Sequence, residues 1–161
     1  MNGILVSDRL QLIPVDPATA TELAAGQCSL PAVGDYPHAD SSTAARMARS
    51  AMEIDNYIPG YGMYVIVSSG LVVGDIGFYA PPSERGVSEV GYGLAPSARG
   101  LGYAVEALTC LINWAFANGT AVVLAETEST NEASQRVLRQ CGFKHSSTQG
   151  SVYRFLKTRE T

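Results

Sequence analysis

The sequence has few of the features that mark membrane, secreted or nucleic-acid-binding proteins. No apolar run approaches the roughly 20 residues of a membrane-spanning helix, and the opening MNGILVSDRLQLIPV lacks the segments of a signal peptide. Positive charge is also scarce, because 11 Lys and Arg face 15 Asp and Glu, for a net charge of -4. This balance argues against nucleic acid as a partner. We therefore expect a soluble, cytoplasmic protein that binds neither membranes nor nucleic acid.

Cysteine is equally sparse. The three cysteines, Cys28, Cys110 and Cys141, are scattered and form no CxxC pair. Their spacing argues against both a disulfide framework and a zinc site, and we expect no metal. Cys110 and Cys141 stand among apolar neighbours, so we interpret them as small core residues.

The composition is that of a globular chain. Apolar residues make up 46% and charged residues 16% of 161 residues, which is enough for a buried core in one domain spanning residues 1–161. Alternating or continuous apolar runs predict strands, and caps and apolar periodicity predict helices. The strands are expected at 9–15, 64–80 (two, around a Ser-Gly turn), 87–94 and 121–127, with a final hairpin after residue 142. The helices are expected to begin at Asp16-Pro17, at Ser41 or Ser42, in the ARGLGYAVEAL stretch and at STNE.

This order of elements predicts an α/β fold with a mixed α+β sheet. Both antiparallel hairpins and crossover connections are needed to join these strands and helices. Gly91 and Gly93 lie inside the strand at 87–94. Glycine in a strand marks a distortion or a close backbone approach.

The stretch ARGLGYAVEAL, residues 98–108, places two glycines directly before a helix. A helix N-terminus presents unpaired N–H groups and a partial positive charge, which together bind anions, phosphates above all. Gly100 and Gly102 would let an anion approach the backbone, and Arg99 adds a forked cationic donor. The alternative is a tight turn with a solvated arginine.

Two nucleotide-binding motifs do not fit this corner. A P-loop needs Gly-Lys followed by Ser or Thr, which is absent. A dinucleotide fingerprint needs Gly or Ala where Val105 stands, and the preceding βαβ frame is missing.

A third motif does fit. The pattern of Arg or Gln, two residues, Gly, one residue, then Gly or Ala is met by Arg99, Gly102 and Ala104. It resembles the acyl-CoA diphosphate loop of the GNAT superfamily of N-acetyltransferases. NEASQRVLRQCGF, residues 131–143, is similar to that family's asparagine-x-x-serine helix followed by Gly-Phe. DRLQLIPV resembles the opening strand of the branch that includes the ribosomal-protein N-terminal acetyltransferases.

The resemblance implies the GNAT fold and acetyl-CoA as cosubstrate. This fold has a central, mostly antiparallel sheet with splayed strands, flanked by about four helices. The strands at 87–94 and 121–127 would separate, and the backbone of Leu94 and Ala95 would bind the pantetheine arm. Asn131 matches the family asparagine that contacts the cofactor; a helix cap is its alternative role. The diphosphate would lie on the corner formed by Arg99, Gly100, Leu101, Gly102, Tyr103 and Ala104.

The same resemblance implies a group that assists the leaving thiolate. Ser134 matches the serine that lies near the cofactor sulfur, and it would donate a hydrogen bond or a proton; an ordinary helix-surface serine is the alternative. Many relatives carry a tyrosine on this helix as the acid, whereas here Tyr92, Tyr103 and Tyr153 lie elsewhere. A CoA thiol has a pKa near that of cysteine, about 8.5, so a hydrogen bond can suffice.

The acceptor amine poses the larger proton problem. At pH 7 an α-amine of pKa about 8 is roughly one-tenth neutral, and a lysine amine of pKa about 10.4 is neutral about once in 2,500 molecules. Glu89 is the first candidate base, because relatives of this branch often have a glutamate at this place before the loop, and Glu126 is the second. A salt-bridged strand residue is the alternative for Glu89. His38 and His145 are isolated and are interpreted as bystanders.

The sequence thus predicts an N-acetyltransferase that moves an acetyl group from acetyl-CoA to a primary amine by direct attack. The acceptor is an amine-bearing small molecule or a protein N-terminus, and a homodimer is a family-level expectation. The alternatives are a non-catalytic acyl-CoA-binding or sensing domain and, more remotely, a general nucleotide-binding module.

Overall fold

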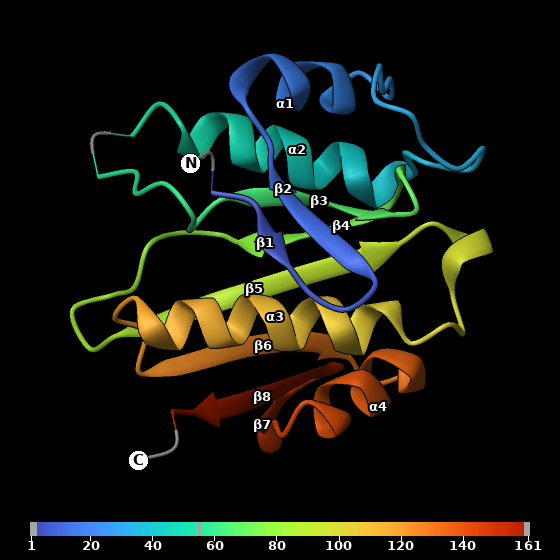
Figure 1. Cartoon of the computed structure of the whole chain (residues 1–161). Helices are drawn as coiled ribbons and strands as arrows, with labels where there is room; N and C mark the ends of the chain where they lie inside the picture. Colours follow the sequence, from blue (N-terminus) through green and yellow to red (C-terminus); the bar gives the residue numbers. More distant parts are fainter. Residues whose placement is uncertain (1–2, 55, 160–161) are drawn as a thin grey trace.

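The computed structural model describes residues 3–54 and 56–159. In these residues one sheet has the strand order β1-β2-β3-β4-β5-β6-β8-β7 (Figure 1). All neighbouring strands are antiparallel except β5 and β6, which are parallel. The strands are β1 (Leu5–Val6), β2 (Leu10–Pro14), β3 (Met63–Ser68), β4 (Leu71–Phe78), β5 (Val87–Leu94), β6 (Val122–Glu128), β7 (Lys144–Gln149) and β8 (Val152–Thr158).

Four α-helices cover the two faces of this sheet in the described ranges. They are α1 (Pro17–Ala24), α2 (Ala39–Ala51), α3 (Tyr103–Ala117) and α4 (Glu132–Gln140), with a short 3₁₀ turn at Pro96–Ala98. In Figure 1, α1 and α2 lie together at one end of the sheet. The helix α3 contacts β1, β2, β4 and β5 on the opposite face. The predicted mixed sheet with about four helices is therefore confirmed.

Each face has its own core. The buried side of α3, with Leu108, Leu111 and Ile112, packs on Val123 of β6 and Phe155 of β8. Burying a residue of this size contributes about 1.5–3 kcal/mol, so α3 is held by packing. Its start need not be stabilised by a side-chain cap.

A second core lies between α1, α2 and the other face of β3. Leu23 of α1 and Ala45 of α2 are fully buried there, beside Met63 and Val65 of β3. The helix α2 begins at Ala39 after His38, two or three residues before the expected Ser41 or Ser42. Ser41 is instead buried against the sheet side of the helix.

The central feature is the separation of β5 from β6. These two strands pair only through Val87–Glu89 and Val122–Leu124. Beyond Glu89, β5 pairs with β4 alone, and β6 pairs with β8 alone. The predicted splayed strands are thus present, and the fork opens toward the start of α3. None of the helices in the described ranges is long and apolar enough to cross a membrane.

Candidate active site

The fork between β5 and β6 encloses a cavity of about 240 Å³. Strand backbone forms its two sides, because the edges beyond Glu89 have no strand partner across the gap. Asn131 and Ser134 of α4 line the same cavity. Exposed strand edges bind extended chains through their unpaired N–H and C=O groups. The fork can therefore take an amide-bearing arm such as pantetheine.

A tyrosine that sequence reasoning left aside reaches into this cavity. The hydroxyl of Tyr92, from β5, lies 2.9 Å from Ser134 Oγ and also donates to the Ser134 carbonyl at 3.3 Å. Burial raises the pKa of Tyr92 to about 12, so the phenol is protonated at neutral pH. A hydroxyl pair from two elements thus lies in the fork, although α4 itself carries no tyrosine.

Asn131 caps α4 and lines the fork at the same time. Its Oδ1 accepts a hydrogen bond from the N–H of Ser134 at 3.1 Å. The helix-cap role is therefore observed. The cofactor contact remains a prediction, although the residue stands on the cavity wall.

The glycine corner leaves the start of α3 bare. Gly100 and Gly102 have φ values of 79° and 82°, in the left-handed region that favours glycine. Gly102 is the N-cap of α3, and no side chain within residues 3–54 and 56–159 caps the helix. The first N–H groups of α3 therefore face outward with the positive end of the helix dipole. The two glycines serve the turn and keep side chains off these groups.

Around this corner, some polar groups are already engaged. Arg99 Nε donates to the Leu94 carbonyl at 3.3 Å, and the Ala95 N–H donates to Val73 at 2.9 Å. The Ala95 carbonyl also accepts from the Ala98 N–H at 2.9 Å. Both backbone groups of Ala95 are therefore engaged, and its contact with pantetheine remains a prediction.

Arg9, which directly precedes β2, connects this corner with the N-terminal part of the chain. It forms an ion pair with Glu106 of α3 at 2.7 Å, donates to the Leu101 carbonyl at 2.8 Å and stacks on the ring of Tyr103. Glu106 also accepts from the Arg9 N–H at 2.8 Å. Arg9 thus fixes the loop between Gly100 and α3 from a position that no local sequence pattern indicated.

Glu89 is the last β5 residue paired with β6, at the closed end of the fork. It is partly buried, and burial raises the pKa of its carboxyl, with a further contribution from the neighbouring negative charge of Glu126. Glu126 itself is ion-paired with Arg154 of β8 at 2.7 Å. No ion pair to Glu89 is found among the described residues. The salt-bridged role thus belongs to Glu126, and Glu89 is the carboxylate left available.

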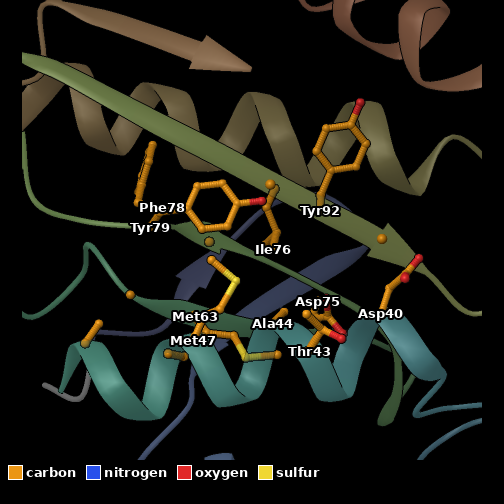
Figure 2. A pocket seen from close by; sticks show the side chains of 16 residues that line it. Asp40, Thr43, Ala44, Met47, Met63, Asp75, Ile76, Phe78, Tyr79 and Tyr92 are labelled. Atoms are coloured by element: carbon orange, nitrogen blue, oxygen red, sulfur yellow. The ribbon is translucent and has the colours of Figure 1, made fainter. Parts of the chain in front are cut away.

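A second cavity, of about 300 Å³, lies on the α2 side of β4 and β5 (Figure 2). Glycines create it: Gly77, Gly91 and Gly93 line it and place no side chains on this face of the strands. A Cβ at Gly91 would overlap the Tyr79 hydroxyl, whereas a Cβ at Gly93 would make an ordinary 3.4 Å contact with His38. The strand glycines thus mark a close approach, as their positions predicted.

The two cavities are adjacent. Tyr79, Gly91 and Tyr92 line both of them. Both cavities therefore border the same short segment of β5. In the part of the chain that the structure describes, no group of three or more His, Cys, Asp or Glu side chains could hold a metal ion.

Comparison with known proteins identifies the family. A model of the acetyltransferase (GNAT) domain matches residues 9–144. The chain belongs to the GNAT acetyltransferase family. An uncharacterised N-acetyltransferase of Bacillus subtilis, YjdG, is 34% identical over 113 residues, which cover 68% of this chain and 67% of the relative.

Solved GNAT structures share the fold over nearly the whole chain. An acetyltransferase of Salmonella typhimurium that modifies the N-terminal serine of ribosomal protein L7/L12 has a TM-score of 0.69 at 17% identity, covering 98% of this chain and 99% of the other. The microcin C7 self-immunity acetyltransferase MccE, solved with acetyl-CoA and AMP, has a TM-score of 0.67 at 15% identity, covering 95% of this chain and 94% of the other.

Family membership makes this GNAT protein an acetyl-CoA-dependent N-acetyltransferase. The expected family, fold, reaction and cosubstrate are thereby confirmed. The corner before α3 and the fork fit such a cosubstrate, because the first offers bare N–H groups to a diphosphate and the second offers unpaired strand edges to an arm of amides. The roles of individual residues remain predictions.

Proposed function

We propose that this GNAT enzyme transfers the acetyl group at the junction of its two cavities, to a primary amine bound under α2. The observation that carries this proposal is the shared lining of the cavities by Tyr79, Gly91 and Tyr92. The fork would hold acetyl-CoA with its thioester toward the closed end at Glu89, next to the β5 segment that lines both cavities. The cavity under α2 would hold the acceptor.

On the cofactor side, the bare N–H groups at the start of α3 and the guanidinium of Arg99 would hold the diphosphate. Gly102, Tyr103 and Ala104 present the start of α3, and Arg99 stands before the corner. Gly100 and Leu101 complete this loop. Leu94, Ala95 and Asn131 would contact the pantetheine arm along the fork. When bound, acetyl-CoA supplies the thioester that the acceptor amine attacks.

On the acceptor side, Glu89 would receive the amine proton, directly or through water. Its raised pKa makes this carboxylate a better base than an ordinary surface glutamate. Glu126 is held by Arg154, which supports Glu89 as the first choice. The neutral amine can then attack, and a positioned base contributes about 10²–10⁴-fold to such a step.

The leaving thiolate would be met by the hydroxyl pair of Tyr92 and Ser134. Their mutual hydrogen bond fixes both groups in the fork, and either oxygen can donate. Because a thiol is a far stronger acid than an alcohol, one donated hydrogen bond is enough to stabilise the departing sulfur. Ser134 thus keeps the predicted role and Tyr92 joins it.

The acceptor screen is the decisive experiment. Free thiol release from acetyl-CoA would be followed across aliphatic amines, aminoglycosides, amino acids and N-terminal peptides. Peptides belong in the panel because the structurally similar Salmonella typhimurium acetyltransferase modifies a protein N-terminus. Turnover with a primary amine, lost when the α2 cavity is obstructed, supports the proposal. Binding of acetyl-CoA with no transfer to any amine would instead support a non-catalytic acyl-CoA sensor.

We also propose the setting in which the enzyme works. Residues 1–161 act as one catalytic domain, since both cavities are built on a single sheet. Cys28, Cys110 and Cys141 are free thiols, which suits the reducing cytoplasm. A homodimer is kept as a proposal that light scattering on the purified protein tests.

A further inference from the structure

The acceptor cavity is lined at one end by a buried carboxylate that forms no ion pair with a lysine or arginine of the described ranges. Asp75 of β4 is only 5% exposed and lines the cavity. Its Oδ2 accepts a hydrogen bond from the Tyr36 hydroxyl at 3.0 Å. Within the described ranges, Asp75 forms no ion pair with a lysine or arginine. Burying an ionised carboxylate without a cationic partner is costly, so this position favours a positive charge brought by a ligand.

The groups around Asp75 reinforce this preference. Asp40, in the first turn of α2, lines the same cavity, and the described lining residues include no lysine or arginine. His38, which precedes α2, has a buried Nε2 without a hydrogen-bond partner among the residues described. Burial raises the pKa of Asp75, the Ser41 and Tyr36 hydroxyls and the His38 ring lower it, and the nearby Asp40 charge raises it slightly. Burial thus disfavours the ionised carboxylate, and an ammonium brought by a ligand would stabilise it.

Asp75 is displaced from the point of acetyl transfer. In the sheet it pairs with Gly93, two residues beyond Gly91, where the two cavities meet. Figure 2 shows Asp75 and Asp40 beside the start of α2, and Met47 and Met63 facing the rest of the cavity. A hydrocarbon segment would thus lie between the reacting amine and the carboxylates.

We propose that Asp75 binds a second cationic group of the acceptor, so that the enzyme prefers aliphatic diamines and polyamines over amines with one charge. The proposal rests on the proposed function, because it assigns the acceptor to the cavity under α2. One ammonium is held at Asp75, the methylene chain lies along Met47 and Met63, and the other amine reaches Gly91. A peptide would instead bury backbone amides against an apolar wall, which is unfavourable.

A matched pair of acceptors tests this assignment. The value of kcat/KM is measured for 1,5-diaminopentane and for 1-aminopentane, which has the same chain with one charge. A charge-assisted contact is expected to give the diamine an advantage of about tenfold to a hundredfold. In Asp75→Asn this ratio falls toward one, because the amide still accepts from Tyr36 and no longer attracts an ammonium. Asp75→Glu retains part of the preference, and Asp40→Asn lowers it less.

The outcomes separate the inference from the proposed function. An unchanged ratio in Asp75→Asn overturns the inference, as does an equal fall for both amines, which would mean a structural or proton-transfer role. Equal turnover of the two amines by the natural enzyme, or faster turnover of an N-terminal peptide, also overturns it, while amine acetylation stands. If acetyl-CoA binds and no amine is acetylated, the proposed function itself is wrong. Melting temperature and acetyl-CoA affinity are measured for each variant as folding controls.

Discussion

Replacing Gly91 with alanine should obstruct acetyl transfer without preventing cofactor binding. A Cβ at this position would overlap the Tyr79 hydroxyl and would lie 2.9 Å from the ring carbon Cζ, closer than real Cβ contacts in proteins. The tyrosine is 45% exposed, so its ring can swing outward and the fold should survive. It must move by about 1 Å at the meeting point of the two cavities, and a misplacement of about 1 Å can cost about 10²-fold in rate.

The expected result for Gly91→Ala is a fall of about 10²-fold in kcat/KM for the acceptor, with the acetyl-CoA dissociation constant changed little. Gly34→Ala is the matched control, because Gly34 lines neither cavity and its Cβ would meet no atom within 4 Å. Steady-state kinetics and calorimetric binding on both variants give the comparison. If Gly91→Ala and Gly34→Ala have the same activity, the transfer point does not lie at Gly91, and the junction of the two cavities is not the active site.

Three further predictions concern the proposed chemistry. Glu89→Gln should lower turnover by about 10²–10⁴-fold at neutral pH. Because burial raises the pKa of Glu89, natural activity should fall as pH drops through that raised value. In Glu89→Gln this fall in activity at low pH should be absent, and the variant's loss of turnover should shrink at high pH, where the acceptor amine is neutral without a base. Full activity in Glu89→Gln from pH 6 to 9 would exclude Glu89 as the base. Arg99→Ala should weaken CoA binding and leave pantetheine binding nearly unchanged; equal effects on the two ligands in a calorimeter would contradict a diphosphate role. Tyr92→Phe and Ser134→Ala should each slow acetyl transfer only modestly and the double variant more than either, measured in single turnovers; an inactive single variant would assign the whole donation to that hydroxyl.

The glycine corner shows what the sequence alone could predict. A helix start preceded by Gly100 and Gly102 is a local feature, because its N–H groups and left-handed φ values depend on neighbouring residues. The spacing of Arg99, Gly102 and Ala104 therefore predicted the family and its cosubstrate. The fork was also predictable, because it follows from the family's order of strands.

The leaving-group site shows why local pattern was insufficient. Tyr92 and Ser134 lie 42 residues apart in the chain, and only the register of β5 beside α4 brings their hydroxyls together. Sequence reasoning sought a tyrosine on the helix and found none. Likewise, the ion pair of Glu126 with Arg154 depends on the pairing of β6 with β8.

The sequence by itself determined the family, the mixed sheet and the bare glycine corner before α3, since the corner is a local feature and the family follows from a spaced motif. Only the tertiary structure decided where the cavity proposed for the acceptor lies. The cavity under α2 exists because Gly77, Gly91 and Gly93, from two paired strands, leave the same face bare while α2 packs across it. Asp75 is buried by that packing, and no pattern in the residues around it specifies a neighbour from another element.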